Sequence, residues 1–331
     1  MKKKFNIMLC TLIGVLSACN EYDFDQEQYR NEVGLLSNSS LIYDRQVANV
    51  GQEKDTIYLV ATVSGSQISP NTHHVALLES DSLLKAYNKS NFDIEKEKFA
   101  KLLPDECYDF PNKELDIQAG TSKVMFPIYL KNLERISPDS IYFLDYKIDP
   151  DKSHVLLRIY KENYYATTKT STYYNYTSST IVIPNPSGSP EVRRPTNANQ
   201  VFPIGANSVR MMAGDEDLGD YKTARSRIVS KSIILEIGEQ QPENPQAREL
   251  TIRAHDRVND VEVDPVDVVQ LTPIDDYDNT FLLNAIRTPD GRATYYKEFR
   301  LHYKYRLEST APYREVKAKL RYEFNPRVDN L

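Results

Sequence analysis

The sequence lacks tryptophan altogether and has only three cysteines, five histidines and eleven glycines among 331 residues. The histidines do not have the spacing of zinc ligands. The chain has no Gly-x-Ser-x-Gly elbow and no phosphate-cradling glycine loop, which disfavours the hydrolases and nucleotide-binding proteins that use them. With 41 basic and 47 acidic residues the net charge is −6, and no basic stripe indicates nucleic acid as a partner. The sequence therefore contains no recognisable catalytic motif, and we expect no cofactor and no metal.

The N-terminal segment has the layout of a bacterial lipoprotein export signal. Lysines occupy positions 2–4, residues 5–16 form an apolar run, and Ser17 and Ala18 precede Cys19. The run is too short to span a bilayer comfortably, since a transmembrane helix needs about 20 apolar residues. We therefore expect residues 1–18 to be removed as a signal peptide, and lipidated Cys19 to anchor the chain in the outer membrane. An ordinary secretory signal that happens to precede a cysteine is the alternative.

The cysteine chemistry follows from this assignment. Cys10 would leave with the signal peptide and Cys19 would carry acyl chains, so Cys107 would be the single thiol of the mature chain. Neither an intramolecular disulfide nor a cysteine-based zinc site could then form.

Residues 19–32 are expected to form an acidic tether, because they lack any apolar period. Acidic residues directly after a lipidated cysteine resemble the surface-export signal of Bacteroidota lipoproteins. This resemblance implies exposure on the outer surface of the cell.

Residues 33–150 have the pattern of a first, strand-rich domain. The chain as a whole has 23 tyrosines, 11 phenylalanines and 18 prolines with little helical periodicity, which favours antiparallel β structure. Residues 124–130 alternate between apolar and other side chains, and Pro127 indicates an edge strand or a bulge. Half a dozen such strands over about 120 residues fit an immunoglobulin-like β-sandwich.

One helical interruption is expected within this domain. Asp81 or Ser82 can cap a short helix, and a second short helical segment is expected over residues 94–103, before Pro104.

A second domain, residues 151–331, is expected after the polar, proline-containing boundary at residues 149–152. Eight or nine further strand patterns follow, beginning with residues 155–160, and this number suits a closed or nearly closed antiparallel β-barrel. The last two strands are long and strongly alternating, which predicts a terminal hairpin. Residues 183–202 are rich in Pro, Asn, Ser and Gly and are expected to form a loop without its own structure.

Several stretches resemble known families. Residues 81–88 (DSLLKAYN), 102–104 (LLP) and 115–120 (LDIQAG) resemble the BT_3987-like N-terminal domain, also called DUF1735. The second domain is similar to DUF4361, through the stretches 201–204 (VFPI), 208–214 (SVRMMAG), 277–281 (YDNTF) and 296–305 (YKEFRLHYKY). The resemblance implies an immunoglobulin-like domain followed by a calycin-like barrel of lipocalin topology. It also implies a surface lipoprotein of a polysaccharide-utilisation locus, where non-catalytic modules hold glycan near an outer-membrane importer, and it supplies no catalytic residues.

A cluster of tyrosines is the most suggestive feature for ligand binding. Sugar rings present an apolar C–H face, so an exposed aromatic ring beside amides offers stacking together with directed hydrogen bonds. The candidate ligand-binding residues are Tyr164, Tyr165, Tyr173, Tyr174, Asn175 and Tyr176. Tyr173 and Tyr174 are the first candidates. The alternative is structural, because tyrosines on barrel strands often fill the core or the rim.

Two acidic clusters raise the question of an ion site. Residues 275–279 carry four acids or amides, whose oxygen atoms are the ligands that Ca²⁺ prefers, but the spacing is not that of an EF-hand loop. A solvated turn is the other interpretation. Asp215, Glu216, Asp217 and Asp220 have the same ambiguity and fit an acidic hairpin tip.

The function that these observations favour is the non-catalytic capture of extracellular polysaccharide or oligosaccharide by a lipid-anchored surface protein. The alternatives are adhesion or protein interaction through exposed strand edges, and binding of a lipid or small apolar ligand inside the barrel. A glycoside hydrolase needs only two carboxylates about 5–10 Å apart, but two modest β domains would be an unusual scaffold for one.

Overall fold

The computed structural model describes residues 30–148, 153–169, 171–219, 224–258, 262–287 and 289–326. The signal peptide, Cys19, nearly all of the tether and the expected boundary at 149–152 lie outside the described residues. Within the described part of the chain, no helix is both long and apolar enough to cross a membrane.

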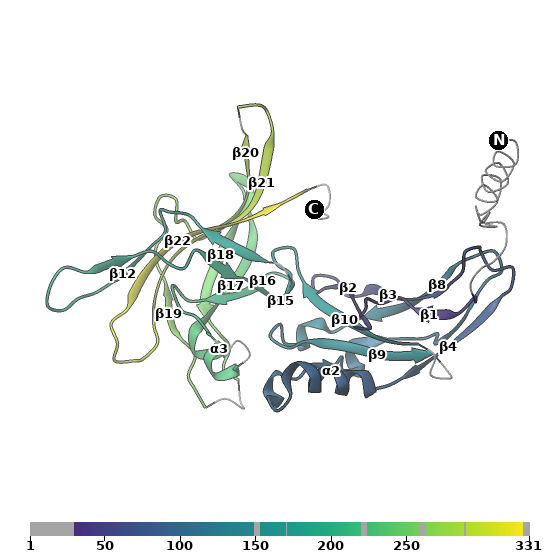
Figure 1. The fold of residues 1–331 in the computed structure, drawn as a ribbon. Coiled ribbons are helices and arrows are strands. Elements are labelled where there is room, and N and C mark those ends of the chain that lie inside the picture. Colours follow the sequence, from purple (N-terminus) through teal and green to yellow (C-terminus); the bar gives the residue numbers. More distant parts are fainter. Residues whose placement is uncertain are drawn as a thin grey trace, which may run out of the picture.

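The first domain is a sandwich of two β-sheets (Figure 1). Its strands are β1 (Val33–Leu35), β2 (Ile42–Asn49), β3 (Asp55–Val63), β4 (His73–Glu79), β5 (Lys101–Leu102), β6 (Tyr108–Asp109), β7 (Glu114–Ile117), β8 (Lys123–Leu130), β9 (Tyr142–Ile148) and β10 (His154–Glu162). One sheet has the order β1-β3-β8-β6 and the other the order β2-β10-β9-β4-β7, with β5 beside β9. A single core cluster includes Phe126 and Ile128 from the first sheet and Tyr146 and Leu157 from the second. The expected β-sandwich is therefore observed.

Strand β8 shows the alternation that the sequence predicts. Phe126, Ile128 and Leu130 are buried, whereas the side chains between them are exposed or half-buried. Pro127 lies opposite Tyr58 of β3, and β6 on the other side reaches only the last two residues of β8. Pro127, which has no N–H to donate, thus lies where β8 is an edge, as predicted.

The expected helix is α2 (Ser82–Phe92), which lies against the second sheet with Leu84 buried (Figure 1). Asp81 occupies the N-cap position, but its side chain makes no capping hydrogen bond and pairs with Lys85 instead. The prediction of a second helix over residues 94–103 is wrong, because only a single 3-10 turn, Lys96–Lys98, forms before β5.

Strand β10 completes the sheet of the first domain. It pairs antiparallel with β9 on one side and parallel with β2 on the other. The sequence pattern assigns residues 155–160 to the second series of strands, whereas the structure pairs them with strands of the first. The last residues of β10 lie beside the second domain, so this strand links the two parts of the chain.

The second domain is one twelve-stranded antiparallel sheet with a short helix. Its elements are β11 (Thr172–Asn175), β12 (Thr180–Ile183), β13 (Glu191–Arg193), β14 (Ala198–Gln200), β15 (Phe202–Gly205), β16 (Ser208–Met212), α3 (Arg225–Lys231), β17 (Ser232–Gln241), β18 (Asn244–Ala254), β19 (Asp267–Gln270), β20 (Thr280–Arg287), β21 (Ala293–Arg306) and β22 (Arg314–Phe324). The main path runs β13-β12-β22-β21-β20-β18-β17-β16-β15, while β11 pairs with β14 and β22, and β19 with β21. The terminal hairpin β21–β22 is confirmed. The loop expected over residues 183–202 instead contains β13 and β14.

The all-β class is confirmed, but the sheet does not close into the expected calycin-like barrel. In the ranges that the structure describes, β13 pairs only with β12, β14 only with β11 and β15 only with β16. No ladder therefore joins β15 to the other end of the sheet. Pro203 in β15 has no N–H to donate and is typical of an edge strand, and β14 has only three residues that could pair with another strand. The inner face is filled by side chains that include Phe281, Phe299, Leu301 and Tyr303.

Candidate functional site

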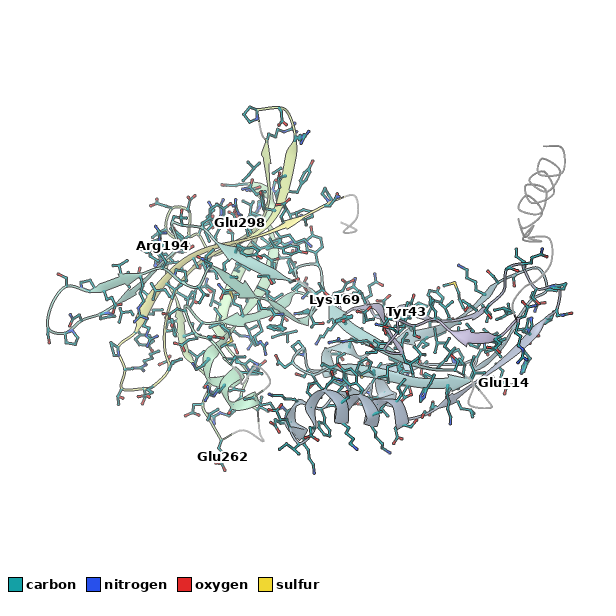
Figure 2. The ribbon with its side chains drawn as sticks, in the orientation of Figure 1. Tyr43, Glu114, Lys169, Arg194, Glu262 and Glu298 are labelled. Carbon is teal, nitrogen blue, oxygen red and sulfur yellow. The ribbon has the colours of Figure 1, made fainter. Side chains whose placement is uncertain are left out.

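The two domains meet along the end of β10, and charged side chains cross the junction. Arg210 of β16 makes two hydrogen bonds to the carboxylate of Asp139, at 2.5 and 2.6 Å. Lys169, which Figure 2 shows between the domains, lies 3.4 Å from the carboxylate of Asp44 in β2. Two charged contacts therefore join the domains, one of them buried and the other exposed.

Two cavities lie at this junction, on opposite sides of β10. Successive side chains of a strand point to opposite faces. Accordingly, Lys161 lines a small cavity of about 190 Å³, and Glu162 lines a cleft of about 960 Å³.

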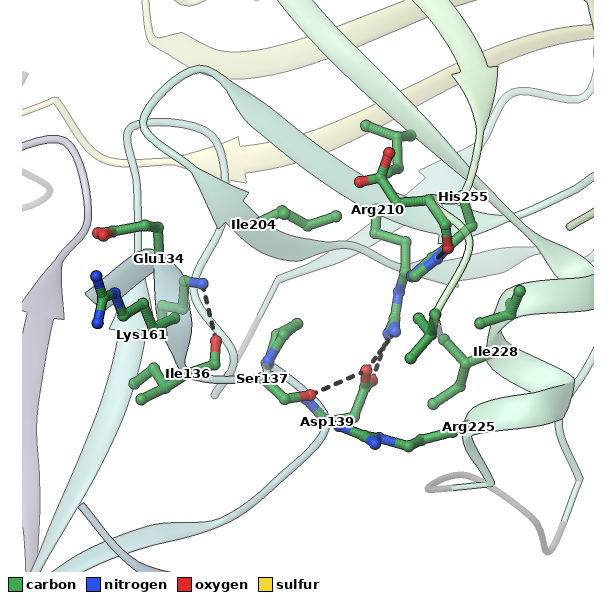
Figure 3. A pocket seen from close by; sticks show the side chains of 16 residues that line it. Glu134, Ile136, Ser137, Asp139, Lys161, Ile204, Arg210, Arg225, Ile228 and His255 are labelled. Atoms are coloured by element: carbon green, nitrogen blue, oxygen red, sulfur yellow. Dashed lines mark hydrogen bonds and ion pairs between the residues drawn. The ribbon is translucent and has the colours of Figure 1, made fainter. Parts of the chain in front are cut away.

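The residues around the small cavity hold the two domains together (Figure 3). Its wall holds the Arg210–Asp139 pair, several aliphatic side chains and Lys161, whose Nζ donates to the backbone oxygen of Ile136 at 3.1 Å. Arg210 is 1% exposed, so its guanidinium relies on Asp139 in place of water. Burial lowers the pKa of Lys161 to about 8, although the charges of Glu134 and Asp139 act in the opposite direction.

Replacing Lys161 with methionine is expected to stabilise the protein near pH 7, and to do so less at higher pH. Folding lowers the pKa of Lys161 from 10.5 to about 8, so below pH 8 both states hold the proton and the cost of burying the charge is fully present. Between pH 8 and 10.5 the unfolded chain binds more protons than the folded chain, and the free energy of unfolding therefore rises with pH. This rise, about 3 kcal/mol for the wild type, is absent from the variant.

Urea unfolding at pH 7 and at pH 10 checks this prediction. We expect Lys161→Met to be more stable by about 1–3 kcal/mol at pH 7, after loss of the bond to Ile136, and by little or nothing at pH 10. An unchanged difference between the two proteins at both pH values would contradict it.

The large cleft is the candidate binding site because its size and lining suit a polar ligand of several rings. The first domain contributes Val47, Asn49, Gly51, Gln52, Asp55 and Glu162. The segment after β10 and the second domain contribute Asn163, Tyr164, Tyr165, Ala166, Thr167, Ser171, Ala206, Asn207, Arg248, Lys297 and Tyr322. Ligand sites often lie between domains and combine aromatic side chains with a few fixed polar groups.

The aromatic wall of the cleft is formed by Tyr164 and Tyr165. Their rings lie edge to face with centroids 5.2 Å apart, and Tyr165 packs in turn against Phe281 at 4.9 Å. Tyr165 is buried, whereas 37% of Tyr164 is exposed. Lys297 Nζ lies 4.7 Å from the centre of the Tyr164 ring and donates to the Tyr164 backbone oxygen at 2.5 Å. Tyr164 is thus an aromatic ring held in place and open to a ligand.

The polar wall is held by hydrogen bonds to the backbone. Asp55 accepts the N–H groups of Asn49 and Thr56 at 2.7 and 2.8 Å. Burial raises the pKa of Glu162, the charge of Asp55 raises it further and Lys297 lowers it. Asp55, Glu162 and Lys297 all line the cleft, so a ligand there would meet two carboxyl groups and an ammonium group.

The side-chain amide of Asn163 holds the turn between β10 and β11 in its conformation. Asn163 accepts the N–H groups of Tyr165 and Ala166 at 3.0 and 2.9 Å, and its NH₂ group donates to the backbone oxygens of Gly205 and Ser208. This turn places Tyr164 and Tyr165 in the wall of the cleft directly after β10.

Arg248 supplies a cation on the second-domain side. One of its NH₂ groups donates to the backbone oxygen of Gly238 at 3.3 Å. Burial raises the pKa of both Tyr164 and Tyr165, and the charge of Arg248 opposes this for each hydroxyl. A guanidinium beside two tyrosines can donate to the hydroxyl groups of a sugar.

The predicted tyrosine cluster is divided by the structure. Tyr164 and Tyr165 line the cleft, but Tyr173 does not reach any surface. Tyr173 is 0% exposed, its hydroxyl donates to the Tyr165 backbone oxygen at 2.6 Å, and its ring packs against Phe299 at 5.0 Å. The expectation that Tyr173 stacks on a ligand is therefore wrong, because its phase on β11 points it into the core.

The remaining predicted residues lie outside the cleft. Tyr176 donates to Glu298 at 3.0 Å and lies against Arg321, and Asn175 donates to the Thr196 backbone oxygen at 2.7 Å, so both hold loops in place. Tyr174 lies on the outer face of the sheet and is 56% exposed.

Several residues of the cleft were not anticipated, namely Asp55, Glu162, Arg248, Lys297 and Tyr322. A signal existed for Lys297. It has the same strand phase as Phe299 and Leu301, which point inward, and a lysine in the inward phase of a strand is unusual.

The two acidic clusters are turns neutralised by neighbouring cations. Asp276 lies 3.6 Å from Lys319, and Asp278 lies 3.8 Å from Arg300. In the other cluster Glu216 pairs with both Lys231 and Arg314. No group of three or more potential metal-ligating side chains occurs among the described residues, which do not include Asp220.

Comparisons with known proteins identify the two domains. A family model of an N-terminal domain matches residues 29–155, and a model of the corresponding C-terminal domain matches residues 153–321. The comparison with curated proteins found no match.

Three solved structures share the fold. A multidomain protein including DUF1735 from Bacteroides ovatus is 17% identical, with a TM-score of 0.63 over 90% of this chain and 97% of that chain. A protein of unknown function from Bacteroides ovatus is 15% identical, with a TM-score of 0.60 over 94% and 97% of the two chains. An auxiliary nutrient binding protein from Bacteroides thetaiotaomicron is 17% identical, with a TM-score of 0.57 over 84% and 87%. On the strength of the two family models, which together span nearly all of the described residues, the chain belongs to the family of multidomain DUF1735 proteins.

Proposed function

We propose that this protein is a non-catalytic lipoprotein that captures extracellular glycan in the cleft between its two domains. The observation that carries the proposal is the cleft itself, where the half-exposed ring of Tyr164 lies among fixed hydrogen-bonding groups from both domains. A sugar unit needs both an apolar surface for its C–H face and donors and acceptors for its hydroxyls. The auxiliary nutrient binding protein of similar fold supports a role in nutrient capture.

The packed interior of the second domain argues against the apolar-ligand alternative. Phe281, Phe299 and Leu301 fill the inner face of the sheet and are at most 1% exposed. A lipid would need a hollow interior in their place.

The proposal is tested with affinity gels that contain yeast mannan, xylan, starch, arabinan or pectin. We expect at least one polysaccharide to retard the protein and none to release reducing ends. Tyr164→Ala should weaken binding by about 1–2 kcal/mol, which corresponds to about five- to thirtyfold in Kd. Tyr129→Ala is the matched control, because Tyr129 is 39% exposed but lies on the first domain away from the cleft.

Three results would contradict the proposal. Release of reducing ends would show catalysis. Retardation by none of the polysaccharides, or equal retardation of Tyr164→Ala and Tyr129→Ala, would exclude the cleft as the glycan site and favour adhesion.

The anchoring of this protein is a separate proposal. Cys19 follows a complete export signal, and lipidation there would hold the cleft at the outer surface beside an importer. We expect cells labelled with radioactive palmitate to label the wild type and not Cys19→Ser, and protease added to intact cells to degrade the wild type. Labelling of Cys19→Ser would contradict lipidation at this residue, and protection from protease would contradict surface exposure.

A further inference from the structure

A second cavity with sugar-binding chemistry lies on the outer face of the C-terminal sheet. It has a volume of about 370 Å³ and is lined by Thr172, Tyr174, Tyr296, Arg321, Tyr322 and Glu323. Tyr174 pairs with Arg321 across β11 and β22, and Tyr296 pairs with Glu323 across β21 and β22. The four side chains therefore share the face opposite the buried core residues Tyr173 and Leu320.

The arginine in this cavity is held between aromatic rings. The guanidinium carbon of Arg321 lies 4.7 Å from the ring centre of Tyr176 and 4.9 Å from that of Tyr296. Stacking on rings keeps a guanidinium in one orientation while its N–H groups point outward in its plane. Beside it Tyr174 leaves more than half of its surface exposed. An exposed ring next to an oriented donor and the acceptor Glu323 is the combination that a sugar unit requires.

The outer cavity adjoins the junction cleft. Tyr322 lines both cavities, and the consecutive residues Ser171 and Thr172 line one each. Ser171 and Thr172 lie at the start of β11 and Tyr322 near the end of β22, so the two cavities are neighbours that share one lining residue.

We propose that Tyr174, Tyr296 and Arg321 form a second sugar-binding subsite, which takes a further unit of the same chain that lies in the junction cleft. The inference rests on the proposed function and specifies its ligand as an extended stretch of polysaccharide, longer than the cleft alone can hold. Two sites that bind one chain raise its affinity through a high effective concentration at the second site.

The experiment uses full-length protein and the oligosaccharides, from two to ten units, of whichever polysaccharide retards it in the gels. Calorimetry should show that wild-type affinity rises with length by at least about tenfold beyond the value for short chains. Tyr174→Ala should abolish this rise and leave the affinity for short chains unchanged. Tyr164→Ala should weaken binding at every length. Tyr129→Ala serves as the control, and circular dichroism verifies that each variant is folded.

The outcomes separate the two proposals. If short chains bind and Tyr174→Ala matches the wild type at every length, the second subsite is refuted while glycan capture stands. If Tyr174→Ala weakens short and long chains equally, the inference is also refuted, because Tyr174 would then belong to the primary site. If no chain and no polysaccharide binds the wild type, both proposals fail together.

Discussion

Replacing Gly214 with alanine is expected to lower the free energy of unfolding by about 2–6 kcal/mol, the sum of two costs. Gly214 has φ +52°, a left-handed conformation that costs a residue with a Cβ about 1–3 kcal/mol. The added Cβ would also lie 2.6 Å from the ring of Tyr305, and such overpacking costs about 1–3 kcal/mol. Tyr305 cannot retreat easily, because its hydroxyl donates to Asp215 at 3.0 Å and its ring is buried.

Gly219→Ala is the matched control for Gly214→Ala. Gly219 has φ +55° in the same connection, but a Cβ there would meet no atom within 4 Å. Its substitution should therefore lower the free energy of unfolding only by the cost of the left-handed backbone conformation, about 1–3 kcal/mol. Urea unfolding followed by circular dichroism measures both variants. Equal destabilisation of the two proteins would show that the contact with Tyr305 carries no cost.

Asp139→Ala is expected to destabilise the protein by about 3–5 kcal/mol, because it leaves a buried cation without its partner. Arg210 is almost fully enclosed at the domain junction, and the Asp139 carboxylate accepts two of its N–H groups. The effect should reach beyond one domain, since the pair joins the loop before β9 to strand β16.

The double variant Asp139→Ala/Arg210→Met tests this explanation. Removing the buried charge together with its partner should restore much of the lost stability, because an apolar side chain of similar length carries no desolvation cost. Urea unfolding of the two single variants and the double variant gives the coupling energy of the pair. Additive losses would mean that the two residues act independently and that the charge of Arg210 is tolerated without Asp139.

The parts of the fold that could be predicted from the sequence are those that local patterns determine. The alternation of residues 299–305 places Phe299, Leu301, Tyr303 and Tyr305 on one buried face, as the structure has them. Pro127 indicates an edge because a missing N–H is a local property. The sheet to which β10 belongs is set by pairing with β2, more than a hundred residues earlier in the chain, and no pattern within β10 encodes that partner.

The candidate site could be predicted only in part, for the same reason. Tyr173 and Tyr174 are adjacent and chemically identical, and in a four-residue strand without apolar alternation nothing local decides which of them faces the core. The apolar neighbours of Arg210 in β16 indicate that its side chain is buried and needs a charged partner. Nothing in the sequence identifies that partner as Asp139, because Asp139 lies in the other domain. The cleft is formed by residues between 47 and 322, so it exists only once the domains are joined.

The position of β10 also determines how the molecule would respond to mechanical load. The strand is hydrogen-bonded along both edges, to β2 and to β9, and its far end leads into the domain that carries Tyr174. A force that draws the second domain away along the strand axis loads all of these bonds in parallel, whereas an edge strand pulled in the same direction would load only one ladder. If the second domain binds a polymer as proposed, flow that pulls on this polymer would load two intact ladders at once.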